Sequence, residues 1–179
     1  LFTATIILQL ESEGKLSIND SVSNYIDLKQ HNTAGITIKH LLNHTSGLYI
    51  YTKDRRLKWE DSMDQCLEYS LKRKLSFTPG SEYHYCNTGY LILGLIIEKV
   101  TGLSFNENLT ERILEPCELK SMIYCEDEKT PSNTARGYNK KRKKYIDITD
   151  IDHSWANSAG AILCNSSDLN QFVKQLFNG

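Results

Sequence analysis

Tyr85 and Asn87 are separated by one residue and stand directly before an apolar run, in YHYCNTGYLILG (residues 83–94). In an extended backbone, residues i and i+2 point to the same side, so this pair would face one cleft while Cys86 faces the protein. A phenol, with an ordinary pKa of about 10, becomes a base near neutral pH only beside a cation such as a lysine ammonium. Asn87 could hydrogen-bond a substrate amide and the same lysine. The alternative is a structural tyrosine followed by a helix-capping asparagine.

A turn and a helix must hold this pair in place. Pro79 and Gly80 predict a tight turn ahead of it. Behind it, residues 88–100 are apolar enough for a buried helix, and Gly102 is a suitable C-terminal cap. The pair is therefore predicted at the N-terminal end of a core helix, where the chain leaves a loop.

Further helices are predicted from apolar periodicity and capping residues. They are a largely buried helix over residues 1–13 ended by Gly14, a short helix capped by Thr37 and ended by Gly47, an amphipathic helix over residues 59–71, a helix with a capping box of Ser104 and Glu107 that Pro116 ends, and a last helix over residues 168–177 capped by Ser167. Strand signals are sparse, and residues 134–149 predict two short strands around a basic turn. This pattern fits the helical part of an α+β protein, and the absence of repeats or linkers predicts a single domain.

The composition is that of an ordinary globular chain. Of 179 residues, 40% are hydrophobic and 24% are charged, which is enough for one domain with its own core. A net charge of −1 predicts neither nucleic acid nor an anionic membrane as a general partner. No stretch of about 18 apolar residues occurs, so no membrane span is predicted. The five cysteines form no C-x-x-C pair, which argues against a zinc site or a complete disulfide framework and favours small apolar fillers.

Other residues offer weaker candidates for chemistry. Ser46 lacks the first glycine of a G-x-S-x-G nucleophile elbow, and His40 and His44 are interpreted as hydrogen-bonding scaffold. Ser12 and Lys15 spell S-x-x-K, but Gly14 breaks the helical turn between them, and a helix C-terminus disfavours an oxyanion. That pair is therefore not interpreted as catalytic.

Residues 140–144 are five consecutive basic side chains, KKRKK. The simpler interpretation is a solvated hairpin tip, and the alternative is contact with an acidic partner. A nucleic-acid-binding module acting through these residues remains a further hypothesis, which strongly salt-dependent binding would support.

Four ordered segments together carry a resemblance to a known family. They are HLLNHTSGL (residues 40–48), PGSEYHYCNTGYLILGLIIEKVTG (residues 79–102), ARGY (residues 135–138) and SAGAILCNSSDLNQF (residues 158–172). In this order they resemble the serine β-lactamase, penicillin-binding-protein and esterase family, in its branch related to class C β-lactamases. The resemblance covers nearly the whole chain and implies a β-lactamase/DD-peptidase-like fold of the α+β class. This chain, residues 1–179, would be a single partial domain of it, mostly the helical region.

The resemblance assigns roles to several residues. Tyr85 and Asn87 match the second catalytic motif of the family, Y-x-N, with Cys86 where the family usually has Ser. Ser158 and Gly160 are implied to line the cleft, and Ala161 stands where a second Gly is common. The first motif, S-x-x-K, is expected directly before Leu1, and the third, K-T-G or H-x-G, beyond residue 179. We therefore expect this chain to be an internal fragment that is inactive by itself.

The implied activity is hydrolysis through an acyl-enzyme, in which Tyr85, coupled to the lysine of the first motif, moves the serine proton. No metal or organic cofactor is expected. The implied substrates are small molecules or peptides: esters, β-lactams or D-amino-acid peptides, with an esterase or peptidase favoured over a dedicated β-lactamase. The alternative is a non-catalytic β-lactamase-like protein, or an inactive truncated product, that only binds a ligand.

Overall fold

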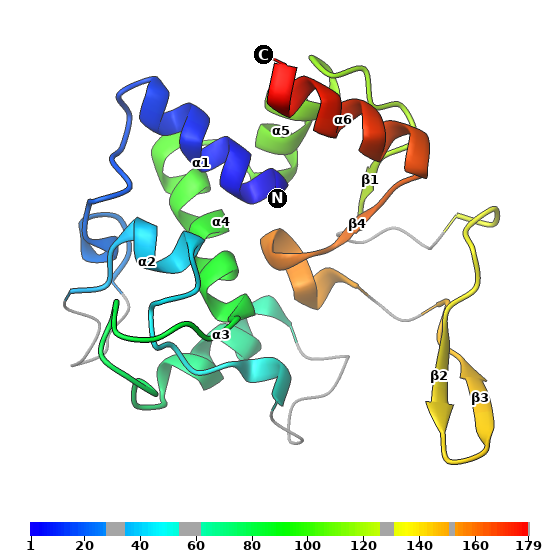
Figure 1. Cartoon of the computed structure of the whole chain (residues 1–179), viewed down its shortest axis with the longest axis horizontal. Helices are drawn as coiled ribbons and strands as arrows, with labels where there is room; N and C mark the ends of the chain where they lie inside the picture. The colour runs from blue at the N-terminus through cyan, green and yellow to red at the C-terminus, as the bar shows by residue number, and fades with distance from the viewer. Residues whose placement is uncertain (28–34, 54–61, 126–130, 151–152, 179) are drawn as a thin grey trace.

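A long central helix organises the computed structural model, which describes residues 1–27, 35–53, 62–125, 131–150 and 153–178. This helix is α4 (Asn87–Thr101), and α1 (Phe2–Ser12), α2 (Ile38–Leu42) and α3 (Met63–Leu71) pack around it (Figure 1). Short 3-10 helices lie in the connections: η1 (Val22–Asn24), η2 (Tyr51–Lys53) and η4 (Ser154–Ala159). The last of these packs directly on α4.

Helix α4 forms because its apolar residues leave almost no polar face. Leu91, Ile92, Leu93, Ile96 and Ile97 are all fully buried. Burying each such side chain contributes about 1.5–3 kcal/mol. The helix ends at Gly102, which adopts a left-handed conformation with φ of 76°. The predicted core helix and its cap are confirmed.

The shorter N-terminal helices agree with the sequence except at one boundary. Helix α1 buries Ile6, Ile7 and Leu10, as predicted, and Gly14 follows it with φ of 68°. Thr37 caps α2 through the backbone N–H of His40, as predicted. The prediction that Gly47 ends α2 is wrong, because the helix stops at Leu42. Gly47 is needed for another reason: a Cβ there would overlap the carbonyl oxygen of Phe77.

Helix α3 begins at Met63, after a capping box formed by Ser62 and Gln65. The prediction placed its start at residue 59, and residues 59–61 lie outside the described residues. Further along, Ser104 and Glu107 form the predicted capping box of α5 (Phe105–Leu109). This helix continues into a π-helical turn, η3 (Thr110–Leu114), before Pro116.

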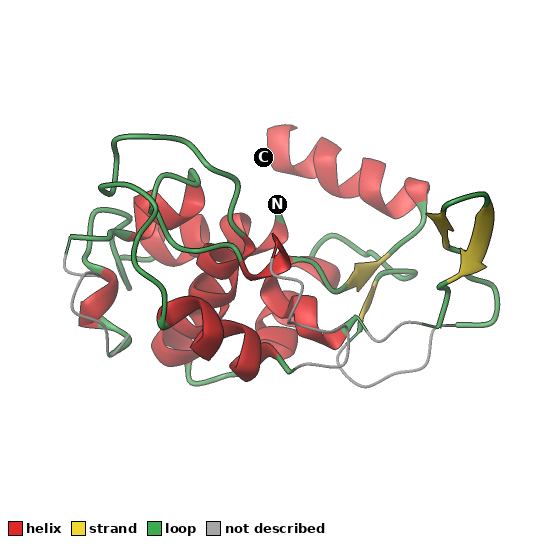
Figure 2. Ribbon diagram, turned by 90° about the horizontal axis from the view of Figure 1, so that it is seen from below, coloured by secondary structure: helices red, strands yellow, loops and turns green. Residues whose placement is uncertain are grey.

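The last helix, α6 (Ser166–Asn178), begins earlier than the sequence indicated. Ser167 lies inside it, so the prediction that Ser167 caps the helix is wrong. The side-chain oxygen of Asn165 performs that function, accepting the backbone N–H of Asp168 at 2.8 Å. Figure 2 shows α6 as an outer layer, and its Phe172 packs against Phe2 of α1 with ring centroids 4.4 Å apart.

Two small antiparallel sheets complete the described structure. The predicted hairpin is confirmed as β2 (Tyr138–Lys141) and β3 (Lys144–Asp147). A second pair, β1 (Ile123–Tyr124) with β4 (Ile162–Leu163), was not predicted. Helices dominate and the strands are short, as expected for the helical region of an α+β fold.

The described residues also bear on the expectations for a membrane span and for the cysteines. Among them, no single helix is long and apolar enough to cross a membrane, and α4 with the following helical segment passes that test only as a pair bent by 84°. No disulfide joins the five cysteines, all of which lie in the described part of the chain, and Cys66, Cys86 and Cys125 are buried, as small apolar residues would be.

Candidate functional site

The loop that follows α2 holds the segment carrying Tyr85 and Asn87. The carbonyl of His44 accepts the backbone N–H of His84 at 2.9 Å. The Nδ1 atom of the same histidine accepts the backbone N–H of Cys86 at 3.2 Å. His44 reaches both groups from a left-handed conformation, with φ of 60°. The interpretation of His44 as scaffold is therefore confirmed.

Cys86 faces the protein, as predicted, and is 2% exposed. Its thiol donates to the carbonyl of Leu48 at 3.4 Å, and the Thr88 hydroxyl donates to the carbonyl of Tyr49 at 2.7 Å. Cys86 is also the extended residue that precedes α4, so Asn87 is the first helical residue rather than the cap. The side chain of Tyr85 points the other way and is 56% exposed.

The ring of His44 fixes the orientation of the neighbouring tyrosines. Its centroid lies 4.6 Å from that of Tyr85 and 5.0 Å from that of Tyr90. Burial lowers the pKa of His44, which favours the neutral ring whose Nδ1 can accept a hydrogen bond. The Tyr85 ring thus packs on a support of neighbouring rings while more than half of the residue stays exposed.

Ser158 reaches the site from η4 on the opposite side of α4. Its hydroxyl donates to the carbonyl of Tyr90 at 2.9 Å, and its own carbonyl accepts the hydroxyl of Thr3 at 2.6 Å. Its side chain fits against Gly94 of α4, where any Cβ would overlap it. Ser158 is 4% exposed, so it contributes to the site mainly as a wall, and the exposed Gly160 follows it.

These elements enclose a pocket of about 340 Å³. Its lining residues are Leu1, Phe2, Thr3, His44, Tyr85, Tyr90, Ser158, Ala159, Gly160, Ile162 and Cys164. Three of the four residues predicted from the sequence, Tyr85, Ser158 and Gly160, therefore share one pocket. The start of α1 closes it, because Leu1 and Thr3 lie in the same wall.

Asn87 lies beside this pocket rather than among its lining residues, next to Tyr51. Tyr51 is 2% exposed, and its ring packs edge-on against Trp155 with centroids 5.9 Å apart. Burial raises the pKa of Tyr51, and the contact with the Asn87 side chain acts in the opposite direction. Sequence reasoning missed Tyr51, because nothing in GLYIYTK distinguishes it from an ordinary core tyrosine.

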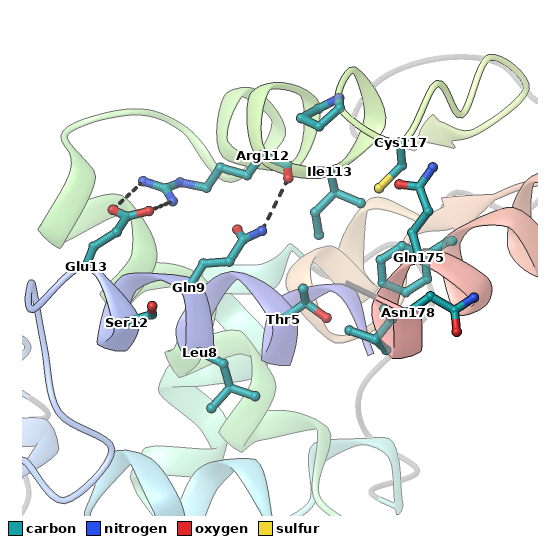
Figure 3. Close-up of a pocket in the computed structure, with 13 residues that line it drawn as sticks. Thr5, Leu8, Gln9, Ser12, Glu13, Arg112, Ile113, Cys117, Gln175 and Asn178 are labelled. Carbon is teal, nitrogen blue, oxygen red and sulfur yellow. Dashed lines mark hydrogen bonds and ion pairs between the residues drawn. The ribbon is translucent and has the colours of Figure 1, made fainter.

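A larger pocket, of about 900 Å³, lies between α1, η3 and α6 (Figure 3). It contains Ser12, the serine of the S-x-x-K sequence that was not interpreted as catalytic. Lys15 forms an ion pair with Glu13 at 2.8 Å, and Arg112 binds the other oxygen of Glu13 at 2.6 Å. Through these two cations the pKa of Glu13 falls to about 2. The cation that would have to activate Ser12 thus interacts with a carboxylate.

No metal site accompanies either pocket in the part of the chain that the structure describes, where no group of three His, Cys, Asp or Glu side chains could hold an ion. The phenol of Tyr85 lines the smaller pocket, and the amide of Asn87 lies beside it. These groups suit proton transfer and the binding of an acyl group.

The chain has the β-lactamase/transpeptidase-like fold, which its solved structural neighbours share. The protein-family model described as Beta-lactamase matches residues 1–179, and the chain belongs to that family. The expected family and fold class are confirmed.

Several relatives have named activities. The chain is 28% identical, over 176 residues, to the teichoic acid D-alanine hydrolase of Staphylococcus aureus. It is similar to the crystal structure of a D-stereospecific amidohydrolase from Streptomyces sp., with a TM-score of 0.90 and 29% identity. It also resembles the D-amino acid amidase of Ochrobactrum anthropi SV3 complexed with L-phenylalanine amide, with a TM-score of 0.87 and 25% identity.

These similarities cover almost all of this chain but only part of each relative. They span 97% of the chain and 43% of the teichoic acid D-alanine hydrolase. For the two solved structures they span 98% and 99% of the chain, and 57% and 53% of the other protein. The chain thus spans about half the length of the relatives that it matches.

Proposed function

We propose that, in the full-length protein, this chain is the helical part of a serine hydrolase that cleaves esters or amides of D-amino acids through an acyl-enzyme. The observation that carries the proposal is the pocket in which Tyr85, Ser158 and Gly160 meet the first residues of α1. The names of the three relatives supply the substrate class, since each refers to a D-amino acid, D-alanine or a D-stereospecific reaction.

The nucleophile in this proposal is the serine of an S-x-x-K motif directly before Leu1. Such a motif would extend α1 backwards by about one turn, so its serine and lysine would share one face. Because Leu1 already lines the pocket, the lysine would stand beside Tyr85. Its ammonium would favour the phenolate form, which an isolated phenol does not adopt near neutral pH. The N-terminal end of the helix would favour a developing oxyanion.

The proton then moves between three atoms during acylation. The serine hydroxyl attacks the acyl carbonyl while Tyr85 takes its proton, and the bond to the leaving alcohol or amine breaks as Tyr85 returns the proton to it. Water hydrolyses the acyl-enzyme by the same transfers in reverse. Asn87 orients the substrate carbonyl group and the lysine, and Tyr51 beside it holds that amide in place.

Ser158 and Gly160 form the opposite wall of the proposed acyl site. The Ser158 hydroxyl already donates to Tyr90, so this residue supports the wall through packing rather than by binding substrate with its hydroxyl. Gly160 has no side chain, and it lets the substrate pass close to the backbone. The third catalytic motif is proposed to lie beyond residue 179.

The test is a substrate panel on the full-length protein. We expect turnover of D-alanine methyl ester and D-alanine amide, at least about tenfold slower turnover of the L-alanine counterparts, and labelling by a serine-directed fluorophosphonate. The isolated 179-residue chain should not be labelled. Faster turnover of a β-lactam than of every D-alanyl compound would contradict the substrate class, and binding without turnover would indicate a non-catalytic protein.

A further inference from the structure

The β2–β3 hairpin projects from the helical body and is exposed along its whole length (Figures 1 and 2). Its base is closed by the N–H of Ile148, which donates to the carbonyl of Gly137 at 2.9 Å, and by an ion pair between Arg136 and Asp147. A two-stranded ribbon with both faces in water is marginally stable by itself. The exposed Tyr138 therefore lies on a sheet face that the body of the protein leaves uncovered.

Charge is concentrated on this hairpin to an unusual degree. Residues 136–147 contain six of the 21 Lys and Arg residues and only one of the 22 Asp and Glu residues. Because the whole chain has a net charge of −1, the remaining residues carry a net charge of −6. The positive potential of the molecule is thus gathered on one projecting element rather than spread over the surface.

The tip of the hairpin is built at a cost to its own stability. The strand register places Lys141 directly opposite Lys144, and like charges in that position repel. The two turn residues between them are Arg142 and Lys143, and Arg142 adopts a left-handed φ of 56° without being glycine. A tip that only needed to be soluble would require none of this crowding. A row of bound negative charges would relieve it.

The cations occupy both faces of the ribbon as well as its tip. Lys140 pairs with Tyr145 on one face, with its ammonium 5.9 Å from the ring centre, and Lys141 and Lys144 lie on the other face. A flat membrane surface could contact only one of these faces at a time. A flexible linear polyanion could contact both faces and the tip together, so the arrangement fits a polymer better.

We propose that the β2–β3 hairpin is a docking arm for a linear phosphodiester polymer that carries the D-aminoacyl groups cleaved at the smaller pocket. This inference rests on the proposed function, whose site it extends. Only residues 150–153 separate the hairpin and Thr149 from η4, which supplies Ser158 to the pocket wall. The same stretch of chain therefore links the docking arm to the proposed acyl site.

Binding can be measured apart from catalysis on the full-length protein with the Tyr85→Phe substitution. The probe is fluorescein-labelled poly(glycerol phosphate) without acyl groups, and the readout is anisotropy at rising salt. The tip variant K141Q/R142Q/K143Q/K144Q should raise Kd about tenfold or more at low salt and flatten the salt dependence. The matched control K39Q/K74Q/K99Q/K120Q removes four exposed lysines outside the hairpin and should change Kd less than about twofold.

Two binding results would overturn the docking arm. One is an equal loss of affinity in the tip variant and the control, which would mean that the polymer senses only net charge. The other is tighter binding of a single-stranded DNA oligonucleotide with the same number of phosphates, which would identify a nucleic-acid site instead.

Kinetics separate the docking arm from the proposed function. With active enzyme, the tip variant should raise KM for D-alanylated poly(glycerol phosphate) about tenfold while leaving turnover of D-alanine methyl ester unchanged. Unchanged KM for the polymer in the tip variant would overturn the docking arm while the hydrolase stands. If the wild type hydrolyses neither substrate, the proposed function fails, and the docking arm fails with it as a substrate-binding element even if the unacylated polymer binds.

Discussion

Both pockets are lined by helix α1: the smaller lies where the helix begins, and the larger extends from Thr5 to its C-terminal end. The surroundings of the smaller pocket nevertheless favour chemistry more than those of the larger one. The larger pocket, of about 900 Å³, contains Ser12 at the C-terminal end of α1, in an S-x-x-K sequence. The smaller, of about 340 Å³, lies where α1 begins and where the segment before α4 presents Tyr85. The partial positive charge at a helix N-terminus stabilises developing negative charge, and the C-terminus does the reverse.

The electrostatic surroundings widen this difference. Around Ser12 the two nearby cations, Lys15 and Arg112, both interact with Glu13. In the smaller pocket, Tyr85 is exposed, and its ring packs against the ring of His44, whose lowered pKa favours the neutral form. Neither a sequence motif nor the volume of a cavity is therefore sufficient for proposing a reactive site. The direction of the adjoining helices, and whether the nearby cations are already paired, distinguish the two pockets more clearly.

The largest effect is expected from removing one hydroxyl in the smaller pocket. Tyr85→Phe in the full-length protein should lower kcat/KM for D-alanine methyl ester by about 10²- to 10⁴-fold, because proton transfer to the serine is lost. The melting temperature should barely change, since the ring is 56% exposed. Tyr83→Phe is the matched control, because Tyr83 lies outside the pocket lining. Equal activity of the two variants would defeat the role of Tyr85.

A second change tests the wall that Ser158 forms. Gly94→Ala places a Cβ where the Ser158 side chain lies, so we expect a loss of about 1–3 kcal/mol in the free energy of unfolding. Gly89→Ala is the control within α4, because its Cβ would meet Leu41 atoms only at 3.6 Å. It should be neutral or stabilising by up to about 1 kcal/mol. Urea unfolding compares the two, and equal stabilities would contradict the tight α4–η4 contact.

The support under Tyr85 should respond to pH. Burial lowers the pKa of His44, so the folded state binds its proton less readily than the unfolded state. The stability that depends on neutral His44 is present above the unfolded value of about 6.5 and is lost as pH falls toward the lower folded value. His44→Asn, which tolerates the left-handed backbone, should lose this step. Melting temperatures at pH 7.5 and pH 5 measure it, and identical pH responses would count against the interpretation.

The smallest expected effect concerns the larger pocket. Ser12→Ala should leave fluorophosphonate labelling and turnover of the full-length protein within about twofold of the wild type. Its S-x-x-K sequence ends in a lysine that pairs with Glu13. A large loss of labelling would reverse the ranking of the two pockets.

Local signals in the sequence were sufficient for most of the helices. The apolar run of α4 and the capping box of Ser104 and Glu107 act within a few residues, so they could be recognised without the fold. The prediction of a cap at Ser167 is wrong because Asn165, Ser166 and Ser167 are all suitable cap residues, and their types do not tell which one precedes the first helical turn. The pairing of β1 with β4 joins two-residue strands almost forty residues apart, which have no local signature.

The candidate site likewise has parts that could be predicted from the sequence and parts that could not. The alternation that turns Cys86 inward and Tyr85 outward follows from two neighbouring residues, and it could be predicted. The packing of the His44 ring against Tyr85, and the placement of Tyr51 beside Asn87, depend on how separate segments meet in space. Ser158 and Gly160 came from the family resemblance, and no rule of spacing would have selected them.

The hydrogen bond between Thr3 and Ser158 also has a consequence for synthesis. It joins residues 155 positions apart, so the wall it forms cannot close until Ser158 has left the ribosome. At about 5–20 residues per second, the start of α1 waits roughly 8–30 seconds for its partner. During that interval α1 can already pack on α4, so the wall at Ser158 joins this site later than the helix packing that supports it.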